Sequence, residues 1–141
     1  MRNIFLLIAY TLILIPFFMK TKSSKLLFQA AKTGNSSVIS KEVAQGASID
    51  AYDDDGFTPL MLAVKNNNYD AARTLLEHDA DPNKNRRDDL TTPLMLAAQN
   101  GNARMIKVLK TGKAALNLKN LLGQTAANIA KDPDIANLLK S

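Results

Sequence analysis

A segment that repeats about every 33 residues limits what this chain can fold into more than any other feature of its sequence. Three stretches align without gaps: 27–35 (LFQAAKTGN), 60–68 (LMLAVKNNN) and 94–102 (LMLAAQNGN). A fourth, imperfect copy begins at Thr125. A period of this length indicates a stack of small similar units, each of which buries its apolar face against its neighbours.

Each unit is predicted to be a helix, a turn and a second helix, followed by an extended loop. Thr-Pro pairs at 58–59 and 92–93 are typical helix starts, because Thr caps the free N–H groups and Pro occupies a position that needs no donor. Residues with positive φ are expected after the first helix, at Gly34, Asn67 and Gly101. The second helices are expected to bury Val38, Ile39, Val43; Ala71, Ala72, Leu75, Leu76; and Met105, Ile106, Leu109.

These motifs resemble the ankyrin repeat family. Its pattern T-P-L-x-x-A, a glycine turn, L-L and then G-A-D-x-N is met best by residues 58–83 and nearly as well by 92–117. The resemblance covers about four-fifths of the chain and implies an all-α, elongated solenoid of about 3.5 repeats with β-hairpin loops on one side. The units are expected to comprise an N-terminal capping repeat, two full repeats and a truncated C-terminal capping repeat: 24–57, 58–91, 92–124 and 125–140.

The sequence departs from the family pattern at a few positions. Met61 and Met95 replace the usual histidine, so the polar contacts of that histidine between repeats are expected to be absent. Asp79 stands where glycine is expected, at a small cost to that helix end. Gly112 falls one residue early, which leaves the local register open.

An apolar N-terminal stretch precedes the repeats and is expected to be helical. Residues 4–19 contain no charge, and residues 1–23 are predicted to form a signal peptide or a transmembrane anchor. A helix over residues 4–19 rises about 24 Å, which is short of the roughly 30 Å hydrocarbon core. This length favours the signal peptide but allows a short anchor. Lysines on one flank balance Arg2 on the other, so the membrane orientation stays open.

Charge and composition argue against nucleic-acid binding and catalysis. The net charge of +5 comes mostly from the flanks of the apolar stretch, since residues 26–141 contain 14 basic and 13 acidic side chains. The chain has no cysteine and one histidine, His78, predicted at a helix end. The run 53–56 (DDDG) lacks the ligand spacing of a calcium loop. We therefore expect no enzyme, cofactor, metal site or small-molecule substrate.

The family resemblance implies a partner-binding surface at the hairpin tips and the inner face of the first helices. Carried over by position, it selects three groups of residues. The first hairpin and its following helix give Tyr52, Asp54, Asp55, Phe57, Lys65 and Asn66. The second hairpin and its following helix give Asn85, Arg86, Arg87, Asp88, Asp89, Thr91, Gln99 and Asn100, and the third hairpin gives Lys119, Asn120, Leu121 and Leu122.

Two parts of this surface stand out, each with an alternative. Tyr52 and Phe57 are aromatic residues on a hairpin expected to be exposed, as in interface hot spots, although Phe57 could instead pack against the next hairpin. The second hairpin, 83–92, is one residue longer than the other two and presents Arg86-Arg87-Asp88-Asp89, a tip suited to steering an encounter or a self-neutralised loop.

The sequence thus predicts a module that binds a protein partner and is membrane-tethered or exported. The alternative is an adaptor anchored at the membrane and facing the cytoplasm.

Overall fold

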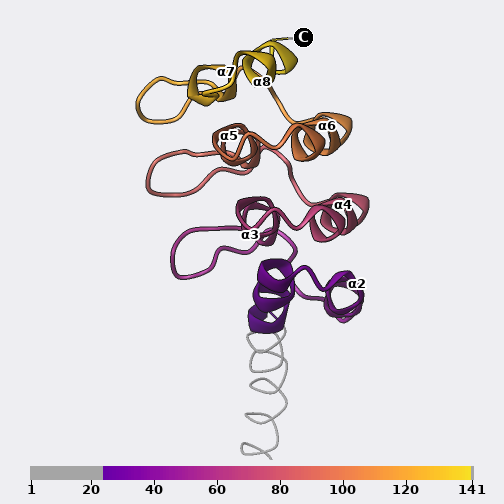
Figure 1. Cartoon of the computed structure of the whole chain (residues 1–141). Helices are drawn as coiled ribbons and strands as arrows, with labels where there is room; N and C mark the ends of the chain where they lie inside the picture. Colours follow the sequence, from indigo (N-terminus) through magenta and orange to yellow (C-terminus); the bar gives the residue numbers. More distant parts are fainter. Residues whose placement is uncertain (1–23, 141) are drawn as a thin grey trace, which may run out of the picture.

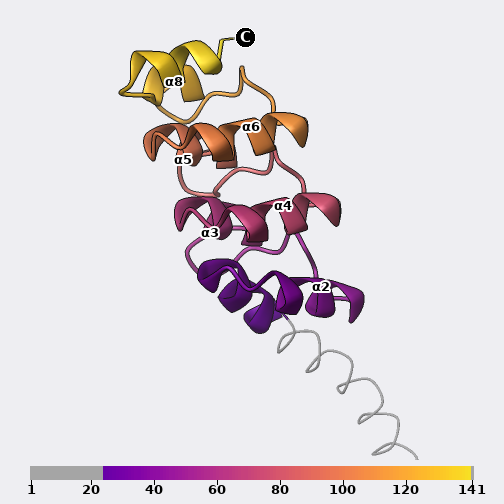
Figure 2. The ribbon, with the colours of Figure 1, turned by 45° about the vertical axis from the view of Figure 1, so that its right-hand side comes forward.

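The computed structural model describes residues 24–140, which form a stack of helix–turn–helix units (Figure 1). Residues 24–33 are helical, and the helices that follow are α2 (Ser36–Ala44), α3 (Pro59–Lys65), α4 (Tyr69–Glu77), α5 (Pro93–Gln99), α6 (Ala103–Thr111), α7 (Ala126–Ile129) and α8 (Pro133–Leu138). The first helices α3, α5 and α7 stack in one column and the second helices α2, α4 and α6 in another. Long loops project from the side of the first helices, and a turned view shows the same layers (Figure 2).

The predicted helix starts at the Thr-Pro pairs are confirmed. The Oγ1 atoms of Thr58 and Thr92 accept hydrogen bonds from the backbone N–H of Met61 and Met95, each at 3.3 Å. Pro follows at the first helical position in both cases. Thr125 caps the short α7 in the same way.

The chain reverses between the helices of each unit at the predicted residues. Gly34, Asn67 and Gly101 have φ of +80°, +56° and +65°. This left-handed conformation suits glycine, and Asn tolerates it better than most residues do.

The ends of the second helices settle the register around Gly112. Gly46, Asp79 and Lys113 occupy equivalent positions with φ of +87°, +65° and +67°, so the repeat register is maintained at Lys113. Asp79 does stand in a glycine conformation, as the sequence predicted. Gly112 ends α6 with φ −75°, and a Cβ there would lie 2.9 Å from Cδ2 of Leu76. Close packing, and not backbone conformation, therefore explains this glycine.

The core lies between the two columns. The apolar stripe of α3 is fully buried, as are both methionines that replace the family's histidine, Met61 and Met95. The Met95 sulfur accepts a 3.4 Å bond from the N–H of Thr92, so its polar contact lies within its own repeat.

Asparagine side chains join neighbouring repeats beside the turns. Nδ2 of Asn68 donates to the carbonyl oxygens of Ala31 and Lys32, both at 2.9 Å. Nδ2 of Asn100 donates to the Val64 carbonyl, the equivalent acceptor in the next unit, at 3.2 Å. These amides add bonds between repeats at carbonyls in the last turn of each first helix, and so help to hold neighbouring units together.

The projecting loops are not β-hairpins with paired strands, since residues 24–140 contain no strand; single turns close the loops, which are too short for a ladder. We keep the word hairpin for these loops. The predicted N-terminal hydrophobic helix, residues 1–23, lies outside the described residues. Within residues 24–140, no helix is both long and apolar enough to span a bilayer.

Candidate functional site: the hairpin face

The first hairpin (50–58) is organised by Asp53. Its Oδ1 accepts hydrogen bonds from the N–H of Asp55 at 3.1 Å and of Phe57 at 2.8 Å. Its N–H donates to the Phe57 carbonyl at 2.9 Å. Within the acidic run, Asp53 therefore closes the turn, and Asp54 and Asp55 remain exposed at the tip.

The third hairpin (117–125) has the same geometry with an apolar tip. Oδ1 of Asn120 accepts from the N–H of Leu122 and Gln124, both at 3.0 Å. Leu121 and Leu122 occupy the tip and are 65% and 80% exposed, and Lys119 beside them is also exposed. Large apolar side chains this exposed on a well-closed turn are available to a partner.

The second hairpin (83–92) contains the extra residue predicted from the sequence. The Arg86 N–H donates to the Thr91 carbonyl at 2.8 Å, and this bond encloses one residue more than the corresponding bonds of the other two hairpins. In this hairpin Asp89 closes the turn, because its Oδ1 accepts from the Thr91 N–H at 2.9 Å. Leu90 has φ +61° where the other hairpins have Gly56 and Gly123.

The charges of the second hairpin are partly neutralised within the loop. Arg86 forms ion pairs with Asp88 at 3.1 Å and Asp89 at 3.4 Å. The guanidinium of Arg87 lies 4.3 Å from the centre of the Tyr52 ring. The alternative of a self-neutralised loop thus describes Arg86 and its two aspartates. Arg87 forms no ion pair with residues 24–140, and it is exposed at the tip together with Asp88.

Each hairpin is hydrogen-bonded to the next. The hydroxyl of Tyr52 donates to the Asn85 carbonyl at 2.9 Å, and Nε of Arg86 donates to the Asp55 carbonyl at 3.3 Å. The Leu121 N–H donates to the Asp89 carbonyl at 2.9 Å. These bonds restrict the movement of the three tips relative to one another, which lowers the ordering cost of binding a partner.

Of the two expectations for Phe57, the structure supports packing against the next hairpin and not an exposed aromatic. Its side chain is only 7% exposed, because the second hairpin covers it. The guanidinium of Arg86 lies 4.8 Å from the ring centre and Nζ of Lys65 lies 4.5 Å from it. Phe57 therefore supports the hairpin face from below, and Tyr52 is half-buried beside it.

The predicted residues of the first helices lie as expected at the surface. Lys65, Asn66, Gln99 and Asn100 are exposed, although the amides of Asn66 and Asn100 donate to backbone carbonyls. Asn85 and Thr91 are half-buried and contribute mainly backbone contacts.

A hollow missed by the sequence prediction continues this surface toward residues 24–33. It has a volume of about 410 Å³ and includes Phe28 and Lys32 next to Tyr52 and Asp54. Nζ of Lys32 lies 3.9 Å from Oδ2 of Asp53. The repeat alignment could have predicted Lys32 as part of this surface, because it occupies in the first copy the position that Lys65 and Gln99 occupy in the next two.

Comparison with known families agrees with this architecture. Residues 7–86 match a family model described as ankyrin repeats (3 copies), and residues 75–130 match one described as ankyrin repeats (many copies). A search of curated proteins returned no match. The chain belongs to the ankyrin repeat family.

Proposed function

We propose that the chain binds a protein partner through its hairpin tips and the inner face of its first helices. Ankyrin repeats are in general protein–protein interaction modules and are typically not enzymes. The observation that supports this surface most is the row of hairpins bonded to one another, with Asp54, Asp55, Arg87 and Leu122 exposed on it. A preformed surface avoids part of the ordering cost of association.

The structure changes which residues a binding test should alter. Replacing Phe57 or Arg86 would disturb the packing under the hairpins, so loss of binding would be ambiguous. The tip residues Leu121 and Leu122 are better targets, because their side chains are mostly exposed and the turn is closed by Asn120.

Site-specific photocrosslinking tests the proposal. A benzoylphenylalanine residue is placed at Leu122 of the full-length protein, and at the exposed Lys41 of α2 as a matched control on the other column. We expect a discrete protein adduct from Leu122 that is absent from Lys41, and Leu121→Ser should reduce it. Adducts of equal yield from both positions, or from Lys41 alone, would place partner binding elsewhere.

We also propose that residues 1–23 tether or export the module, with an anchored adaptor facing the cytoplasm as the alternative. The uncharged stretch 4–19 with basic flanks supports this proposal. A topology reporter fused after Ser141 tests it. Activity confined to a cytoplasmic reporter would exclude export and favour the adaptor.

A further inference from the structure

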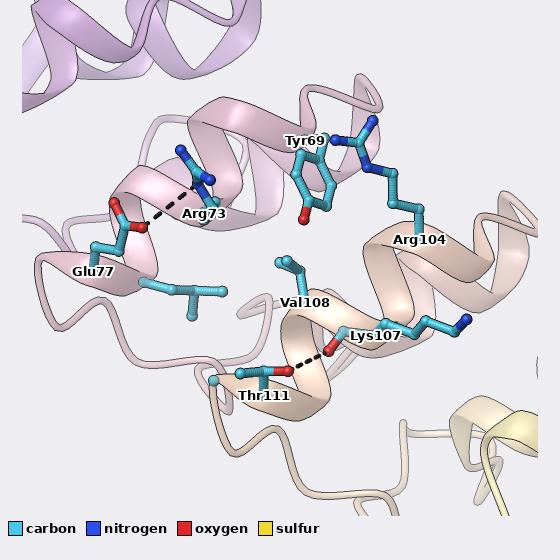
Figure 3. A pocket seen from close by; sticks show the side chains of 9 residues that line it. Tyr69, Arg73, Glu77, Arg104, Lys107, Val108 and Thr111 are labelled. Atoms are coloured by element: carbon cyan, nitrogen blue, oxygen red, sulfur yellow. Dashed lines mark hydrogen bonds and ion pairs between the residues drawn. The ribbon is translucent and has the colours of Figure 1, made fainter.

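An open cavity of about 520 Å³ lies between α4 and α6, in the column of second helices that the hairpins do not reach (Figures 1 and 3). Two adjacent repeats contribute to it, with Tyr69 and Leu76 from α4 and Arg104 and Val108 from α6. Its volume falls within the range of about 300–1,000 Å³ that is usual for small-molecule sites. The binding surface proposed above uses none of these residues.

The inside of the cavity is apolar. Tyr69, Leu76 and Val108 are only partly buried, and in Figure 3 the side chains of Tyr69 and Val108 extend from their two helices into the space between them. Gly112 also lines the cavity, where the methyl groups of Leu76 pack closely against its backbone. An apolar group placed here would remove these three side chains from water, at a gain of about 25 cal/mol per Å² buried.

The rim of the cavity is cationic. The guanidinium of Arg104 lies 3.6 Å from the centre of the Tyr69 ring, so the ring contacts its flat face. Stacking of this kind leaves the in-plane N–H donors free for a carboxylate, which they can bind through two parallel hydrogen bonds. Arg73 already pairs with Glu77 at 3.5 Å, whereas Arg104 and Lys107 form no ion pair with any residue in 24–140.

We propose that this cavity binds a small amphipathic carboxylate. The carboxylate lies against Arg104 and Lys107, and an aromatic or branched apolar body packs on Tyr69, Leu76 and Val108. A bilayer surface fits less well, because membrane-binding helices present protruding apolar side chains, and here the apolar atoms lie inside a hollow. The net positive rim also repels cationic ligands, and neutral ligands lack the charge-assisted hydrogen bonds that a carboxylate forms.

Titration of the full-length, isotope-labelled protein with phenylbutyrate tests the charge requirement. Phenylbutanol and phenylbutylammonium have the same apolar body with a neutral or cationic end and are the matched controls. We expect phenylbutyrate to shift the amide resonances of Tyr69, Val108 and Gly112 in NMR spectra. Phenylbutanol should bind about tenfold more weakly, phenylbutylammonium should not bind measurably, and added salt should weaken phenylbutyrate binding.

Matched variants test the position. Arg104→Gln combined with Lys107→Gln should weaken phenylbutyrate binding about tenfold, whereas Lys41→Gln, which removes one charge from α2 outside the cavity, should leave it unchanged. Thr111→Trp at the exposed edge should block the cavity by volume alone. Thermal melting shows whether each variant stays folded.

Several results would overturn the proposal. Phenylbutyrate and phenylbutanol could bind with equal affinity, or phenylbutyrate could shift none of the amide resonances of Tyr69, Val108 and Gly112. The double variant and the tryptophan variant could also both bind phenylbutyrate as tightly as the unaltered protein does. Shifts produced by an acidic peptide but not by phenylbutyrate would instead assign the cavity to a protein partner.

Discussion

Replacing Lys113 with glycine is expected to stabilise the stack. Lys113 follows the end of α6 with φ +67°, in the position that Gly46 occupies with φ +87° after α2. For a residue with a Cβ, the left-handed conformation raises the free energy of the folded state by about 1–2 kcal/mol. The substitution therefore removes a local strain that the first repeat avoids.

The magnitude follows from two opposing terms. Glycine relieves the strain but loses about 0.5–1 kcal/mol more backbone entropy on folding than other residues do. The Lys113 side chain is exposed and forms no ion pair with residues 24–140, so little is lost with it. We expect a net gain of about 0.5–1 kcal/mol, which corresponds to a rise in Tm of about 2–5 °C for a domain of this size.

Thermal and urea unfolding of the full-length protein, followed by circular dichroism, measures this gain. Lys41→Gly removes the same side chain from the last turn of α2 and should destabilise, by up to about 1 kcal/mol, because the backbone there is helical. Asp79→Gly should stabilise less than Lys113→Gly, since Asp tolerates positive φ better than Lys does. A loss of stability in Lys113→Gly, or equal effects of Lys113→Gly and Lys41→Gly, would refute the role assigned to φ.

Three further substitutions test individual contacts. Gly112→Ala should destabilise by about 1 kcal/mol, because its Cβ would lie 2.9 Å from Leu76, and a lowered urea midpoint would show it. Asn68→Ala should cost about 1–3 kcal/mol, since it breaks two bonds to the preceding repeat; Asn66→Ala, which breaks one bond within its own repeat, should cost less, and the reverse order would contradict the contact. Tyr52→Phe should cost about 1 kcal/mol and raise amide hydrogen exchange in the second hairpin; unchanged exchange would mean that its bond to Asn85 does not hold the hairpins together.

The features that the sequence predicted well are local ones. Thr58 and Thr92 cap helices through bonds that span only three residues, and Gly34, Asn67 and Gly101 adopt their conformations through their own backbone preferences. Such features depend on residue type and spacing, both of which a single repeat displays. His78 likewise lies at the end of α4, as its position in the repeat predicted.

The features that the sequence left open or missed depend on contacts between repeats. The sequence did not decide between an exposed and a buried Phe57, because the residue that covers it, Arg86, lies in the following hairpin. The cavity is formed where Arg104 of α6 lies over Tyr69 of α4, a contact between neighbouring repeats. The period alone brings neighbouring helices together, but it does not specify which side chains meet or how deep the hollow between them is.

Several side-chain hydrogen bonds between neighbouring units end on backbone carbonyls. The Asn68 amide donates to the Ala31 carbonyl of the unit before it, and the Tyr52 hydroxyl donates to the Asn85 carbonyl of the unit after it. Every unit offers such carbonyls whatever its side chains are, and those of Val64 and Lys65 already accept from Asn100. A copy of residues 58–91 inserted after the original would therefore find acceptors for its own Asn68, so the protein could be lengthened by this unit without changing the side chains of the unit before it.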